Sequence, residues 1–83
     1  KTKNKKKFFF YTIIIGDFYF LDSAEKLREE LVNKYKIKNL KILKINDKKF
    51  RLITNEFKDF DSLKKTYINL NKHGFDELNI DIK

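Results

Sequence analysis

Four stretches of the chain have the length and hydrophobic pattern of β-strands. In the last of them apolar and polar residues alternate strictly, which predicts one buried and one solvated face. The others are rich in β-branched and aromatic residues, which strands favour. The predicted strands cover residues 10–15, 40–45, 49–54 and 78–82. The polar segment NDKK at 46–49, between the second and third strands, predicts a hairpin turn.

Two further segments show apolar residues at helical spacing. They are Ala24, Leu27, Leu31 and Tyr35 in the first segment, and Leu63, Tyr67 and Leu70 in the second. We expect Asp22 and Asp61 to be the N-caps, because a carboxylate there accepts hydrogen bonds from the free N–H groups of the first turn. Gly74 suits the left-handed position that ends the second helix, and Phe75 is then placed to pack on Leu70.

The two halves of the chain repeat each other at a distance of 39 residues. Phe57, Asp61 and Ser62 then correspond to Phe18, Asp22 and Ser23. Each half consists of a strand, a turn, a helix and a strand, and we expect positive φ at the turn residues Gly16 and Asn55. Right-handed crossovers place both helices on one face of a four-stranded antiparallel sheet. The sequence therefore predicts an α+β fold, β-α-β-β-α-β, of the RNP or ferredoxin-like type.

Alternation along the first and third strands assigns side chains to the two faces of this sheet. Ile13, Ile15, Leu52 and Thr54 are expected to face the helices, and Thr12, Ile14, Arg51 and Ile53 the open side. These two strands are central neighbours in the predicted topology. Isoleucines on an open sheet face indicate a contact surface, although β-propensity alone also favours isoleucine there.

The amino-acid composition is unusual mainly at the N-terminus, where it sets the boundary of the predicted domain. The 83 residues suffice for one domain, and the net charge is +8. Residues 1–7, KTKNKKK, hold five of the 20 basic residues and no acid. We interpret them as the solvated end of a linker, with the domain covering residues 8–83. The absence of Met and the start at Lys1 indicate a piece cut from a longer protein.

The residue types argue against catalysis. His73 is the single histidine and is expected at a helix end, and the chain has no Cys and no glycine-rich phosphate loop. We therefore expect no enzyme activity, no metal and no cofactor. An RNA-recognition motif shares the predicted topology but needs aromatic side chains on the open face of the third strand. This chain has Lys49, Arg51 and Ile53 there, so nucleic acid is not the expected partner.

The order and spacing of several motifs resemble a SPOR domain. YTIIIGDF (11–18) and FRLITNEF (50–57) are similar to its two strand motifs, SAEKL (23–27) to its first helix, and HGFDELNI (73–80) to the end of its second. The resemblance covers residues 9–82. It implies a bacterial envelope (periplasmic) protein with a membrane-anchored parent, whose module binds peptidoglycan glycan strands lacking stem peptides at division septa. The fragment itself is expected to make no membrane contact.

The resemblance also implies that the ligand lies on the open sheet face. The implied glycan-binding residues are Phe10, Thr12, Ile14, Asp17, Lys49, Arg51 and Ile53. Arg51 matches a polar position of the family, and its guanidinium suits the free carboxylate of muramic acid without its stem peptide. The family's glutamine on the first strand is Ile14 here. A protein partner on the same face, and weak RNA binding, are the alternatives.

Overall fold

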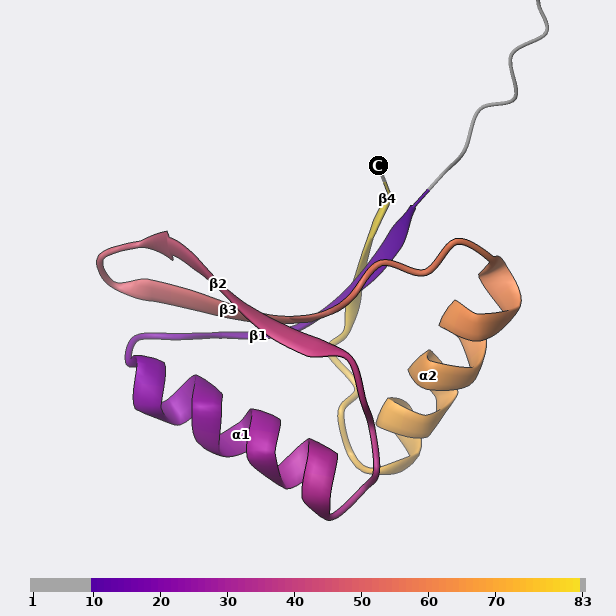
Figure 1. Cartoon of the computed structure of the whole chain (residues 1–83), viewed down its shortest axis with the longest axis horizontal. Coiled ribbons are helices and arrows are strands. Elements are labelled where there is room, and N and C mark those ends of the chain that lie inside the picture. Colours follow the sequence, from indigo (N-terminus) through magenta and orange to yellow (C-terminus); the bar gives the residue numbers. More distant parts are fainter. Residues whose placement is uncertain (1–9, 83) are drawn as a thin grey trace, which may run out of the picture.

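The computed structural model describes residues 10–82 and has the predicted α+β architecture. The elements are β1 (Tyr11–Phe18), α1 (Leu21–Asn33), β2 (Leu40–Asn46), β3 (Lys49–Thr54), α2 (Phe60–Lys72) and β4 (Asn79–Ile82). Both helices lie on the same side of the sheet and splay apart from each other (Figure 1). The segment 1–7, predicted to be a linker end, lies outside the described residues.

β1 and β3 form the centre of the sheet, as predicted. The strand order is β2-β3-β1-β4, and all three pairings are antiparallel. β2 and β3 form a hairpin in which Asn46 pairs with Lys49. The side-chain Oδ1 of Asn46 accepts a hydrogen bond of 2.8 Å from the backbone N–H of Lys48, which fixes the turn. The predicted turn at 46–49 is therefore confirmed.

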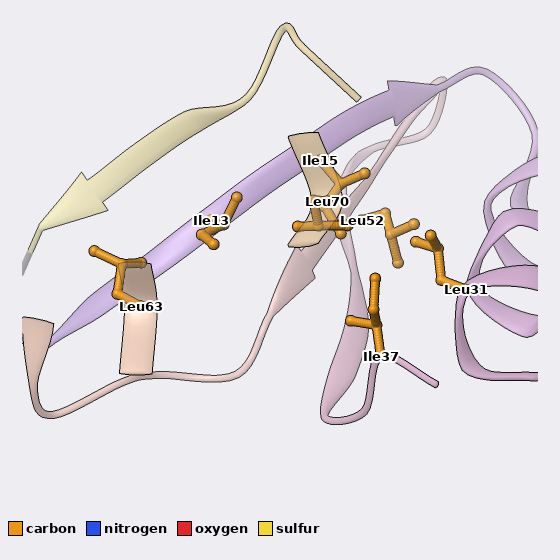
Figure 2. Packing of buried hydrophobic residues seen from close by; sticks show 7 residues of the cluster. All are labelled: Ile13, Ile15, Leu31, Ile37, Leu52, Leu63 and Leu70. Carbon is orange, nitrogen blue, oxygen red and sulfur yellow. The ribbon is translucent and has the colours of Figure 1, made fainter. Parts of the chain in front are cut away.

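The hydrophobic core lies between the sheet and the helices. Its buried residues are Ile13, Ile15, Leu31, Ile37, Leu52, Leu63 and Leu70, and Figure 2 shows their side chains gathered from strands, helices and the α1–β2 connection. The four side chains predicted to face the helices are all buried. Thr54 is the polar one, and its Oγ1 accepts a 2.9 Å hydrogen bond from the backbone N–H of Ile13. The buried hydroxyl of Thr54 and the backbone N–H of Ile13 therefore both have a hydrogen-bond partner.

Helix α2 ends as predicted, in a Schellman motif. Gly74 has a φ of 98°, which glycine adopts without a steric penalty. The backbone N–H groups of Gly74 and Phe75 donate to the carbonyl oxygens of Asn71 and Leu70, each at 3.1 Å. Phe75 packs against the core cluster that contains Leu70, so the end of the helix is joined to the core.

The predicted N-caps are wrong, because both helices begin two residues earlier. α2 begins after Asp59, whose Oδ1 accepts a 3.0 Å hydrogen bond from the backbone N–H of Ser62. α1 begins after Phe20, which makes no side-chain capping bond. Asp61 and Asp22 instead lie in the first turns. An acidic residue in the first turn is favoured by the helix dipole, so the pattern did not distinguish it from a cap.

Gly16 lies at a β-bulge inside β1 and not in the predicted turn. The pairing runs Ile14 with Ile53, Gly16 with Leu52, and Asp17 with Arg51. β1 thus has one more residue than β3 between the first two pairs, which reverses the alternation of side chains beyond the bulge. Neither Gly16 nor Asn55 has a positive φ. The bulge matters for the open face, because it turns Asp17 toward that side.

The edge strand β4 is more exposed than its alternation predicts. Ile80 pairs with Ile13 and Ile82 with Tyr11, on the helix side of the sheet, but the two isoleucines are 43% and 58% exposed, respectively. β4 has a neighbouring strand on one side only, so fewer side chains surround it. Leu78, just before the strand, does pack against the core. The alternation therefore gave the correct face but not the depth of burial.

Candidate functional site

The register gathers six of the seven implied site residues on the open face of the two central strands. Residues directly opposite in antiparallel strands point to the same side of a sheet, as do residues two apart along one strand. Thr12, Ile14 and Asp17 share this face on β1, and Lys49, Arg51 and Ile53 share it on β3. Phe10, the seventh, precedes β1 and is half-buried.

Two of these residues are more buried than an open face predicts. Thr12 is 4% exposed and Ile53 is 5% exposed. Ile53 lies on β3 between Lys41 of β2 and Ile14 of β1, so neighbouring side chains on both sides cover it. The expectation that Thr12 and Ile53 present open surface is therefore corrected. Surface for a ligand comes from Ile14 and from the charged residues beside it.

Arg51 and Asp17 form a bidentate ion pair across β3 and β1. The guanidinium Nε donates to Oδ1 of Asp17 at 2.8 Å, and Nη2 donates to Oδ2 at 3.2 Å. The side chains are 30% and 36% exposed, respectively. The hydrogen bond from Arg51 holds the pKa of the Asp17 carboxyl below its ordinary value, and the same bond raises the pKa of Arg51. Both groups are charged throughout the neutral range.

This pair places hydrogen-bond donors and acceptors side by side on the surface. After bonding to Asp17, the guanidinium keeps both N–H groups of Nη1 and one of Nη2, and each carboxylate oxygen keeps a lone pair. The bidentate geometry expected for a ligand carboxylate is already taken by Asp17. The pair therefore suits groups that both donate and accept, such as hydroxyls.

A groove of about 430 Å³ adjoins this pair at one end of the sheet. We call it the hairpin groove; its lining residues are Asp17, Phe18, Tyr19, Asn46, Lys48 and Lys49. It lies between the turn of the β2–β3 hairpin and the connection from β1 to α1, which meet at the same end of the molecule in Figure 1. Its wall thus combines two lysines, an amide and aromatic side chains.

Sequence reasoning did not assign four residues of this groove to a site: Phe18, Tyr19, Asn46 and Lys48. Tyr19 is 73% exposed and its neighbour Phe20 is 71% exposed, with ring centroids 6.4 Å apart. One signal for this site was available in the sequence. Tyr19 and Phe20 are adjacent aromatic residues between a predicted strand and a predicted helix, and they belong to the hydrophobic pattern of neither element. The two lysines of the turn NDKK were a second signal, but only the structure shows that they and Tyr19 line the same groove.

The remaining candidate features lie away from the open face. His73 is the C-cap of α2, as expected, and its ring lies 4.1 Å from that of Tyr35. Between residues 10 and 82, no three His, Cys, Asp or Glu side chains come together in a way that could hold a metal ion. Within the same range, no helix has the length and apolar character needed to cross a membrane.

No family model matches the chain, and no curated protein matches it in sequence. Its structure is similar to the solution structure of the peptidoglycan-binding domain of the B. subtilis cell wall lytic enzyme CwlC. The TM-score is 0.73, the sequence identity is 18%, and the match covers 99% of each chain. The predicted α+β architecture, and the likeness to SPOR domains, are thereby confirmed at the level of the fold.

Proposed function

We propose that this domain is a non-catalytic module that binds the glycan strands of peptidoglycan and so holds its parent protein in the envelope of a bacterium. The observation that carries the proposal is the Asp17–Arg51 pair beside Ile14 on the open sheet face. The domain also shares its fold with a peptidoglycan-binding domain. We further propose a periplasmic location and a preference for strands without stem peptides, such as those at division septa.

Sugar rings carry hydroxyl groups at the rim and apolar C–H groups on their faces, and the open face offers partners for both. The free N–H groups of Arg51 can donate to hydroxyl oxygens, and the carboxylate of Asp17 can accept from hydroxyl protons. Half-buried Ile14 supplies apolar surface next to the pair. Because the two charged side chains already hold each other in place, little further side-chain entropy is lost on binding.

Co-sedimentation with insoluble peptidoglycan tests the proposal. The wall is used with and without prior treatment by an amidase, which removes the stem peptides. We expect the wild-type domain to sediment with the wall, and more of it after amidase treatment. Wild-type domain that stays in the supernatant with both preparations would contradict glycan binding, and equal sedimentation with both would contradict the preference.

Arg51→Ala should weaken binding to the treated wall by about 1.5 to 3 kcal/mol, the range for hydrogen bonds that involve a charged group. Arg28→Ala is the matched control, because Arg28 is the other arginine of the chain and lies on α1, across the sheet from the open face. Circular dichroism shows whether each variant keeps its fold. Equal losses for the two variants would mean that charge alone, and not the open face, drives sedimentation.

A protein partner on the same face is the second candidate, because exposed Leu43 of β2 pairs with Arg51 and adds apolar surface there. Ile14→Gln separates the two candidates. A glutamine adds a group that both donates and accepts hydrogen bonds, so titration with denuded glycan strands should give equal or tighter binding. A protein held by apolar contact would instead bind this variant more weakly.

A further inference from the structure

On the basis of the proposed glycan binding, we propose that the hairpin groove is the subsite for the carboxylate-bearing sugar of the strand. Lys48 and Lys49 are its anion-binding side chains, and Tyr19 is the surface on which the sugar ring rests. The Asp17–Arg51 pair then binds hydroxyl groups and not the carboxylate. In glycan strands a neutral amino sugar alternates with muramic acid, whose lactyl carboxylate is free only where no stem peptide is attached.

Arg51 is poorly placed to bind that carboxylate. Its Nε and Nη2 already donate to Asp17, at 2.8 and 3.2 Å. A second carboxylate would approach the remaining N–H groups with the negative charge of Asp17 within a few ångströms, and like charges at such a distance repel. A neutral hydroxyl meets no such repulsion and can bond to both partners of the pair.

In contrast to the surroundings of Arg51, the hairpin groove is positively charged. Lys48 and Lys49 line it, and neither forms an ion pair with a carboxylate of residues 10–82. Asp47, the carboxylate of the turn itself, lies 3.5 Å from Lys44 and does not line the groove. Asp17 does line it; this carboxylate is bonded to Arg51, and its charge also attracts Lys49. Because the charge of Asp17 is already matched by that of Arg51, the two lysines leave the groove with a net positive charge for an anionic group.

The backbone of the turn holds these lysines in a defined position. The bond from the N–H of Lys48 to Asn46 Oδ1 is 2.8 Å long, and Lys49 is the first residue of β3, paired with Asn46. The lysine side chains are flexible, but the backbone positions from which they extend are fixed relative to the other lining residues of the groove. A volume of about 430 Å³ lies within the range of small-ligand sites.

The aromatic wall gives the second indication of a ligand. Of the two most exposed apolar side chains in the described residues, Tyr19 lines the groove and its neighbour Phe20 does not. Contiguous exposed apolar surface of this kind marks interaction sites. Phe20 also occupies the N-cap position of α1, where Ser, Thr, Asp or Asn would stabilise the helix. An exposed aromatic residue in place of a capping residue departs from the local preference of helix starts. Such departures are expected at functional sites.

The positive charge of the groove accounts for the proposed preference for denuded strands. A stem peptide is joined to the lactyl group through an amide, which is neutral and bulky. Its removal leaves a carboxylate that two ammonium groups can bind, and charge-assisted hydrogen bonds are about twice as strong as neutral ones. The lysines of the groove would therefore recognise the product of an amidase reaction.

Calorimetric titration of the full chain tests the proposal with two probes. One is a set of amidase-released glycan strands, and the other is chitin oligosaccharides of the same length, which carry no lactyl carboxylate. The variant is Lys48→Gln with Lys49→Gln. Its matched control is Lys64→Gln with Lys65→Gln, an adjacent exposed lysine pair on α2 that removes the same charge. Thermal unfolding checks that each protein is folded.

We expect the groove variant to lose about tenfold or more in affinity for the released strands, as for lost charge-assisted bonds, and to bind chitin oligosaccharides unchanged. The control pair should change neither. Equal losses in the two double variants, or equal losses on both probes, overturn the subsite while glycan binding stands. Wild-type protein that binds neither probe overturns the proposed function itself, and the subsite with it.

Discussion

At the scale of single residues, the Asp17–Arg51 pair joins the two central strands on a solvated face. Its two hydrogen bonds have good geometry, yet both side chains are about one-third exposed. Water and salt screen such pairs, and their usual contribution to stability is only about 0.2 to 1 kcal/mol. The pair therefore contributes less to the stability of the fold than to the chemistry of the face.

The depressed pKa of Asp17 gives a prediction about pH. Its carboxyl binds a proton less readily in the folded state than its ordinary value of 3.8 indicates, chiefly because of the bond from Arg51. The stabilisation is present above that value and is lost as the pH falls through the lower folded-state pKa. Asp17→Asn should thus reduce the free energy of unfolding by up to about 1 kcal/mol near pH 7.

This difference between wild type and Asp17→Asn should shrink steadily below about pH 4, where the wild-type carboxyl begins to be protonated. Urea unfolding across the acid range measures it. Repeating the series in 1 M salt is the control, since screening should reduce the difference at neutral pH. A difference that stays constant down to pH 2 would show that the substitution acts through packing and not through charge.

A second residue-scale prediction concerns the core. Leu52 is fully buried at the centre of β3, whereas Leu27 is only half-buried. Leu52→Ala should destabilise the domain by about 2 to 5 kcal/mol through lost burial and the cavity that remains. Leu27→Ala should cost clearly less. Chemical denaturation measures both, and a loss at Leu52 below about 0.5 kcal/mol, the size of an ordinary surface effect, would contradict the assignment of faces.

The alternation of the strands predicted the core residues but not the environment of the open face. Ile13 and Leu52 face the helices as expected. A two-residue period carries no information on how neighbouring strands surround a side chain, so the burial of Ile53 was missed. Nor did it reveal the bulge at Gly16, because a bulge adds one residue without changing composition. Asp17 was implied by the family pattern, and its bond to Arg51 required the register.

At the scale of elements, the start of α1 lacks the side-chain cap that the start of α2 has. Phe20 and Asp59 occupy the N-cap positions of α1 and α2 and lie 39 residues apart. Only Asp59 caps its helix through its side chain. Sequence reasoning placed the helices well and their first residues poorly, since Asp22 and Asp61 are equally compatible with a cap or a first turn.

Phe20→Asp should therefore stabilise the domain. An aspartate in the N-cap position can accept a hydrogen bond from the first turn of α1, as Asp59 does in α2, and a good cap contributes about 1 kcal/mol. Scanning calorimetry should show a raised melting temperature. Phe20→Ala is the control, because it removes the ring without supplying a cap. A melting temperature of the aspartate variant no higher than that of the alanine variant would contradict the capping argument.

At the scale of the whole molecule, the net charge of +8 is unevenly distributed along the sequence. Residues 1–7 contain five lysines, and the remainder of the chain is only weakly basic. Removing residues 1–7 should leave the melting temperature nearly unchanged, because this segment has no apolar side chain to bury. Its removal should weaken retention on heparin, a generic polyanion, since electrostatic attraction scales with positive charge.

Thermal unfolding and elution from heparin in a salt gradient measure the two effects of this truncation. Unfolding of the truncated domain at a markedly lower temperature would contradict the linker interpretation. Undiminished retention on heparin would show instead that the folded part carries the anion-binding surface. Comparison with the Lys48 and Lys49 double variant then tells whether the hairpin groove is that surface.

The central position of β1 limits the order in which the domain can assemble. β2 and β3 are adjacent in sequence and can form their hairpin within microseconds, but β1 needs β3 on one side and β4 on the other, with Ile13 opposite Ile80. Joining segments so distant along the chain requires loop closure before any contact is gained. During synthesis the apolar strand β1 leaves the ribosome before the other strands of the domain and completes its pairing last. Until β4 has emerged, one edge of this isoleucine-rich strand is open to association with other nascent chains.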